Sequence, residues 1–133
     1  MDFNLLIVED DQTQRELITE ALGSISDIDI EVMSAEDGSE AIKIARMVKF
    51  DAIITDFKMP KINGLEFIKW LKENYPHDNT PIIFVSGFMD QIKAARHANL
   101  FENVLFLEKP FEVKKICNYV FINLAANNEQ SKM

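Results

Sequence analysis

Three acidic residues stand where short apolar runs end. Asp56 follows the run of residues 52–55, and Glu9 and Asp10 follow the run of residues 3–8. Carboxylates that meet at one place repel one another by roughly 4 kcal/mol per pair at about 4 Å, so a cation is expected among them. Carboxylate oxygens without a neighbouring His or Cys favour Mg²⁺ over zinc. The sequence therefore predicts a Mg²⁺ site, provided that the fold brings these segments together.

A serine and a lysine occupy comparable positions later in the chain. Ser86 follows the apolar run of residues 81–85, and Lys109 comes shortly after the run of residues 104–107. A lysine can neutralise phosphoryl oxygens as a point charge, and a serine hydroxyl can donate a hydrogen bond to one of them. In this company the carboxylate of Asp56 is a candidate nucleophile toward phosphorus, and the product would be an aspartyl phosphate.

The elements that must position these residues alternate along the chain. Apolar runs predict five strands: Phe3–Val8, Ile28–Met33, Ala52–Thr55, Pro81–Val85 and Val104–Leu107. Helical spacing of apolar residues predicts five helices: residues 12–23, 36–48, 64–75, 89–98 and 113–126. Such alternation predicts an α/β domain in which a parallel sheet carries helices on both faces. The carboxyl ends of its strands share one edge, where ligands bind in such sheets, so the residues named above should meet there.

Helix faces predict which side chains enter the core. The first helix should bury Leu17, Ile18, Ala21 and Leu22. The last helix carries a stripe of Val113, Ile116, Cys117, Val120, Phe121 and Leu124, which makes the only cysteine a core residue. Tyr119 and Ile122 should point away from this stripe. They are either scattered surface hydrophobic residues or a face for a partner or a second copy.

Length and charge narrow the class of protein. The 133 residues predict one domain, residues 1–126, followed by a frayed polar tail, residues 127–133. The 22 acidic and 14 basic residues give a net charge of −8, which argues against direct binding of nucleic acid. No apolar run reaches the roughly 18 residues that cross a bilayer, and the N-terminus lacks the basic region of a secretion signal. We therefore expect a cytoplasmic protein whose ligands are cations or other proteins.

Four motifs in order carry a resemblance to a known family: LLIVEDD, IITDFKMPKING, FVSG and FLEKPF. From about Asn4 to Leu124 the chain resembles the response-regulator receiver domain of bacterial two-component signalling. The resemblance implies a flavodoxin-like (βα)5 fold with strand order 2-1-3-4-5. It also implies a signalling domain, which assists its own phosphorylation and dephosphorylation, rather than an enzyme that acts on another substrate.

The resemblance assigns the acidic residues to a phosphoacceptor and its metal. It implies that Asp56 accepts the phosphoryl group and that Asp10 and Asp56 bind Mg²⁺ directly. Glu9 stands where aspartate is more frequent in the family, and it would bind the metal directly or through water. The main-chain carbonyl of Lys58 would be a further ligand.

The resemblance also assigns the residues that sense phosphorylation. Ser86 and Lys109 would contact the phosphoryl group, and the peptide bond between Lys109 and Pro110 would be cis. Ser86 and Phe106 would be the switch residues, although Phe106 could equally be an ordinary core residue.

A phosphorylation-dependent switch is the function that this resemblance implies. A sensor histidine kinase or a histidine phosphotransfer protein would donate the phosphoryl group. The surface around the fourth helix, the fifth strand and the fifth helix would then bind a downstream protein or output domain, or a second copy of the chain. The alternatives are a receiver-like module that binds a partner constitutively, and a phosphatase or phosphotransferase that acts on small molecules.

Overall fold

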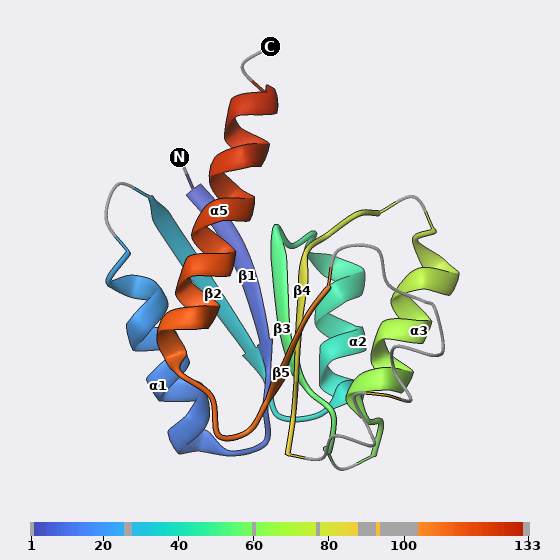
Figure 1. Ribbon diagram of the computed structural model, residues 1–133. Coiled ribbons are helices and arrows are strands. Elements are labelled where there is room, and N and C mark those ends of the chain that lie inside the picture. Colours follow the sequence, from blue (N-terminus) through green and yellow to red (C-terminus); the bar gives the residue numbers. More distant parts are fainter. Residues whose placement is uncertain are drawn as a thin grey trace.

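Five parallel strands form the sheet at the centre of the protein (Figure 1). The computed structural model describes residues 2–25, 28–59, 61–76, 78–87, 93 and 104–131, and only the backbone of residues 126–131. The strands are β1 (Asp2–Val8), β2 (Asp29–Ala35), β3 (Ala52–Asp56), β4 (Ile82–Ser86) and β5 (Val104–Glu108). Their order is β2-β1-β3-β4-β5, which confirms the predicted fold. All of their carboxyl ends lie at the lower edge of the sheet in Figure 1.

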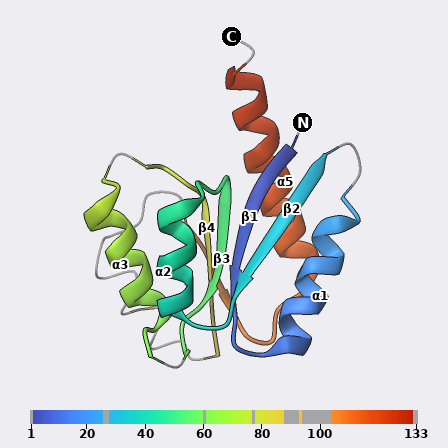
Figure 2. The ribbon, with the colours of Figure 1, turned by 180° about the vertical axis from the view of Figure 1, so that it is seen from behind.

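Helices cover both faces of the sheet. The described helices are α1 (Gln12–Gly23), α2 (Gly38–Met47), α3 (Gly64–Asn74) and α5 (Val113–Ser131). Figures 1 and 2 show α1 and α5 on one face and α2 and α3 on the other. Each face has its own apolar core: Ile18 and Ile116 belong to the first, and Ala41 and Phe67 belong to the second. The central strand β3 is buried along its whole length, because both cores pack against it.

Helix N-termini are fixed by side-chain caps close to the carboxyl edge of the sheet. Asp11 accepts a hydrogen bond from the backbone N–H of Gln14 at 3.2 Å, as expected of a cap. Asn63 and Glu66 form a reciprocal capping box at the start of α3. These caps set where α1 and α3 begin, and therefore how the loops that precede them leave the strands.

Several predicted boundaries and core positions differ from the structure. Strand β2 begins one residue later and ends two residues later than predicted, at Ala35. The predicted helix over residues 89–98 lies almost entirely outside the described residues. Leu17 was predicted to be buried, but its side chain is 49% exposed. It lies at the margin of the α1 stripe, and the core contacts of this helix come from Ile18 and Leu22.

The last helix departs most from expectation. The backbone of α5 stays helical to Ser131, and the frayed tail predicted from residue 127 was wrong within the described part of the chain. Figures 1 and 2 show its C-terminal end projecting beyond the sheet. Phe121, predicted to be in the core, is 43% exposed, whereas Tyr119 packs against the core. None of the described helices combines the length and the apolar character needed to cross a membrane.

Candidate functional site

Strand register brings the predicted site residues to one edge. Val8 of β1 pairs with Thr55 of β3, so Glu9 and Asp56, each one residue further along, come to lie side by side. Asp56 pairs with Val85 of β4. Ser86 then pairs with Glu108 of β5, the residue before Lys109. The order of the strands thus places two acids, a hydroxyl and a lysine at neighbouring strand ends.

Three carboxylates form a compact cluster at this edge. One oxygen from each of Glu9, Asp10 and Asp56 lies within 4.8 Å of the other two. Glu9 is 5% exposed and Asp56 is 7% exposed, whereas Asp10 faces solvent. An all-oxygen donor set with one accessible side fits Mg²⁺, which uses a few carboxylates and keeps several waters. The predicted carboxylate ligands are therefore brought together, and Lys58 lies exposed two residues beyond β3.

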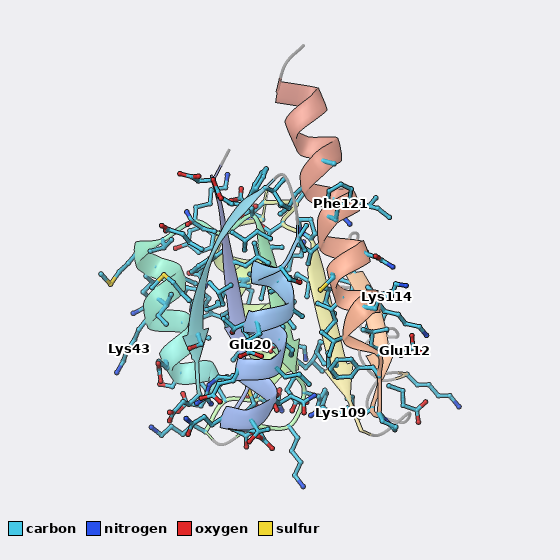
Figure 3. All side chains as sticks on the ribbon, turned by 90° about the vertical axis from the view of Figure 1, so that its left-hand side faces the viewer. Glu20, Lys43, Lys109, Glu112, Lys114 and Phe121 are labelled. Carbon is cyan, nitrogen blue, oxygen red and sulfur yellow. The ribbon has the colours of Figure 1, made fainter. Side chains whose placement is uncertain are left out.

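Lys109 bridges the two buried carboxylates. Its Nζ atom lies 2.8 Å from Oδ2 of Asp56 and 3.7 Å from Oε1 of Glu9. Figure 3 shows Lys109 at the carboxyl edge, near the start of α5. Burial by itself would lower the pKa of Lys109, but its hydrogen bond to Asp56 and the nearby negative charges raise it above its ordinary value. The ammonium group is therefore a fixed positive charge beside the candidate nucleophile.

Among the acidic residues that the structure describes, Glu9 has the pKa that departs most from its ordinary value. Its pKa is raised from 4.5 to about 8, chiefly by burial and also by its hydrogen bond to Asp56 and the negative charge of Asp56. The positive charge of Lys109 acts in the opposite direction. A divalent cation bound among these oxygens would favour the ionised form of Glu9, so metal binding would be coupled to proton release at this residue.

Glu9→Gln is expected to stabilise the protein at pH 8 when divalent cations are chelated. In the folded protein the pKa of Glu9 lies near 8, above its ordinary value of 4.5, so wild-type stability falls as pH rises through this window. The amide cannot lose a proton, and the expected gain in unfolding free energy is on the order of 2 kcal/mol. Thermal unfolding at pH 5 and pH 8 measures it. Glu20→Gln, on the outer side of α1 (Figure 3), is the control, and an equal pH dependence of the two variants would contradict the prediction.

Ser86 and Phe106 connect this edge to the interior of the sheet. Ser86 is fully buried at the end of β4, and Phe106 is half-buried in β5. The ring of Phe106 lies 5.9 Å from that of Phe84, which in turn lies 5.6 Å from the ring of Phe57. Phe57 directly follows Asp56, so a chain of ring contacts runs from the candidate phosphoacceptor to the predicted switch residue. Sequence reasoning missed Phe57 and Phe84, because their contacts follow from strand register.

Two further residues near the site were missed. The side chain of Arg15 donates a hydrogen bond of 2.7 Å to the main-chain carbonyl of Glu9. Gly64 donates its N–H to the carbonyl of Phe57 at 2.8 Å, and a Cβ at Gly64 would overlap the carbonyl oxygen of Asp56. The glycine in the motif KING was visible in the sequence, but its need for close backbone approach was not.

The remaining predicted residues have mixed outcomes. The peptide bond between Lys109 and Pro110 is cis, as the resemblance implied. Ile122 is 64% exposed, in agreement with an outward position. Tyr119 is half-buried, and burial raises its pKa, so the prediction that it points away from the core was wrong. The outward aromatic residue of α5 is instead Phe121, labelled in Figure 3.

Known proteins of one family resemble the chain. The family model of the response regulator receiver domain matches residues 5–121. A probable chemotaxis protein CheY of Rhizobium etli is 31% identical over 112 residues, which cover 84% of each chain. The polar-differentiation response regulator DivK of Brucella anthropi is 31% identical over 88 residues, which cover 66% of this chain and 69% of that protein.

Longer relatives contain a similar segment. A protein-glutamate methylesterase/protein-glutamine glutaminase of Nitrosospira multiformis is 41% identical over 87 residues, which cover 65% of this chain and 23% of that protein. Across that protein and two response regulators, from Anaeromyxobacter and Pseudomonas aeruginosa, the chain spans 23% to 44% of the relative's length.

Solved structures agree with the family match. The receiver domain of the Francisella response regulator 1452 superposes with a TM-score of 0.76 at 25% identity, covering 94% of this chain and 98% of that one. The Vibrio cholerae chemotaxis protein CheY4 gives a TM-score of 0.76 at 26% identity, covering 91% and 98%. Family match, strand order and edge geometry agree, and the chain belongs to the response regulator receiver domain family.

Proposed function

We propose that the chain is a phosphorylation-dependent switch in which Asp56 accepts a phosphoryl group. The observation that carries this proposal is the 2.8 Å contact between Lys109 and Asp56, within a cluster of three carboxylates. Lys109 is placed to pair with the negative charge that a phosphoryl group brings to Asp56. The exposed carboxylate of Asp10 leaves one side of the cluster open to a donor.

The proposed transfer is a substitution at phosphorus. The donor is the phosphohistidine of a sensor histidine kinase or a histidine phosphotransfer protein. Its N–P bond breaks, a bond forms between phosphorus and an oxygen of Asp56, and the freed imidazole takes up a proton. Mg²⁺, held by Glu9, Asp10, Asp56 and the main-chain carbonyl of Lys58, supplies positive charge to the phosphoryl oxygens. Lys109 supplies charge from the other side, and the Ser86 hydroxyl donates a hydrogen bond to the product.

The proposed output is a change in surface around β5 and α5. Ser86 and Phe106 occupy adjacent strands, and the ring contacts from Phe57 through Phe84 reach Phe106. A movement of Ser86 toward the phosphoryl group would change the packing around Phe106, and thereby the affinity for a downstream protein, an output domain or a second copy. Ile122, which is exposed on α5, belongs to the proposed partner surface. Tyr119 packs against the core that supports this surface.

We further propose that this switch acts in the cytoplasm and forms a single domain over residues 1–126. We also propose that it binds no nucleic acid directly. Its net charge of −8 supports the last point. In this proposal the chain is a signalling domain and does not catalyse a reaction on another substrate. The longer relatives show that a similar segment occurs within larger proteins.

Mg²⁺ is expected to raise the melting temperature of the wild-type protein, and Asp10→Asn is expected to remove most of that effect. At 100 times its dissociation constant, a ligand that binds only the folded state stabilises it by about 2.7 kcal/mol. That corresponds to a shift of several degrees. Scanning fluorimetry across a Mg²⁺ titration measures it, with Asp29→Asn at the opposite edge of the sheet as the control. A wild-type melting temperature that does not change with Mg²⁺ concentration would favour a module that binds its partner constitutively.

A further inference from the structure

The turn between β2 and α2 touches both acidic loops of the site. In Figure 1 it runs along the carboxyl edge of the sheet, from the end of β2 toward the start of α2. None of its residues is a candidate metal ligand or phosphoryl contact. Its contacts on either side nevertheless end at the backbone of Glu9 and at the loop that follows Asp56. We call residues 35–38 together with Arg15 the brace.

On one side, the brace packs against the loop that follows Asp56. Gly38 is buried, and its N–H donates a hydrogen bond of 3.2 Å to the carbonyl of Ile62. A Cβ at Gly38 would overlap that carbonyl oxygen and lie 2.8 Å from Cβ and Cγ2 of Ile62. Backbone cannot swing aside as the end of a long side chain can, so any larger residue at position 38 must displace residues 61–63 or α2.

A second contact fixes the same loop. Asp37 caps α2 by accepting a hydrogen bond from the N–H of Glu40 at 2.8 Å. Its other oxygen lies 3.7 Å from Nζ of Lys61. Lys61 has a φ of 66°, in the left-handed region, which marks it as the sharp bend of the loop. Asp37 and Gly38 therefore hold two consecutive residues of the loop that joins Asp56 to α3.

On the other side, the brace holds the main chain of Glu9. The N–H of Glu9 donates to the carbonyl of Ala35 at 3.0 Å. The carbonyl of Glu9 accepts from Arg15 at 2.7 Å, and Arg15 in turn lies 3.7 Å from the carboxylate of Glu36. Both main-chain polar groups of a buried candidate ligand are thus satisfied by the brace.

We infer that the brace positions the two acidic loops relative to each other, and that Gly38 is its most sensitive member. This inference rests on the proposed function. A displacement of the Ile62 loop would be transmitted through Gly64, which packs directly on the carbonyl of Asp56. Groups that orient metal ligands without touching the metal commonly change metal affinity by about 10- to 100-fold when replaced. Gly38 and Arg15 act here as positioning residues.

The test is calorimetric titration of the full chain with Mg²⁺, comparing Gly38→Ala with Gly23→Ala. Both glycines lie in helices, where alanine is intrinsically favoured, and a Cβ at Gly23 meets nothing within 4 Å. Gly38→Ala is expected to raise the dissociation constant of Mg²⁺ at least about tenfold. Gly23→Ala should leave it within about twofold. A purely structural role would lower the melting temperature without Mg²⁺ and leave the dissociation constant unchanged, and that result overturns the inference.

Arg15→Gln decides the matter if Gly38→Ala does not fold. It removes the hydrogen bond to the Glu9 carbonyl while keeping a side chain of helical propensity, and it should weaken Mg²⁺ binding about tenfold. Arg46→Gln is the control, because the guanidinium of Arg46 lies over the ring of Trp70. An unchanged dissociation constant for Arg15→Gln would overturn the inference. Failure of the wild-type protein to bind Mg²⁺ would instead remove the proposed function itself, and the two failures are therefore distinguishable.

Discussion

Asp56→Asn is expected to abolish phosphoryl incorporation while leaving the fold intact. The amide has nearly the shape of the carboxylate but lacks its nucleophilic negative charge, so the bond to phosphorus cannot form. Loss of a nucleophile typically costs a factor on the order of 10³ or more in rate. Incorporation of labelled phosphoryl groups from acetyl phosphate, with saturating Mg²⁺, measures the effect.

Two comparisons make this result specific to Asp56. Asp29→Asn changes an exposed aspartate at the start of β2, at the opposite edge of the sheet, and should incorporate label at the wild-type rate. Unchanged circular dichroism of Asp56→Asn shows that its fold persists. Label incorporated by Asp56→Asn at the wild-type level would mean that another side chain is the acceptor.

Lys109→Gln is expected to slow phosphorylation of Asp56 by roughly 10²-fold. The Nζ atom lies 2.8 Å from Oδ2 of Asp56, so its positive charge lies next to the place where the negatively charged phosphoryl oxygens would arrive during transfer. Loss of one such preorganised donor commonly costs about 10²- to 10³-fold in rate. The measurement is the initial rate of phosphorylation at saturating Mg²⁺ and a fixed donor concentration.

The matched control is Lys43→Gln. Lys43 lies on the exposed side of α2, away from the carboxyl edge (Figure 3). Its replacement by glutamine removes the same charge from the protein. Its phosphorylation rate should stay close to that of the wild type. A wild-type rate in Lys109→Gln would show that this contact belongs to the structure and has no part in the transfer.

The sequence predicted which acidic residues meet at the carboxyl edge, because strand ends in a parallel sheet share one edge. The apolar runs before Glu9 and before Asp56 are each followed by an acidic residue. The prediction that these acids lie close together did not need the exact strand boundaries. The strand order came from the resemblance and was confirmed by the structure. What each residue does in phosphoryl transfer stays a prediction.

Contacts that depend on tertiary detail could not be predicted in this way. The ring contacts of Phe84 need the register of β3, β4 and β5, and the constraint on Gly38 needs the approach of α2 to a loop that follows a different strand. Phe121 was predicted to be in the core and Tyr119 outside it, but the structure has the reverse. A spacing of three and four residues identifies an apolar stripe, but it does not fix how α5 is rotated about its own axis. The polarity of the residues after 126 predicted a frayed tail, but polar residues can also form the backbone hydrogen bonds of a helix, and the backbone of α5 continues to Ser131.

The most direct test of the central claim is the intact-protein mass of the wild type after incubation with a phosphoryl donor, with Mg²⁺ and with a chelator. Acetyl phosphate and phosphoramidate serve as donors, because the second contains the N–P bond of a phosphohistidine. The account predicts one added phosphoryl group per chain with Mg²⁺ and none with the chelator. A folded protein that binds Mg²⁺ and gains no phosphoryl group from either donor would contradict it, as would an adduct that forms equally well without the metal.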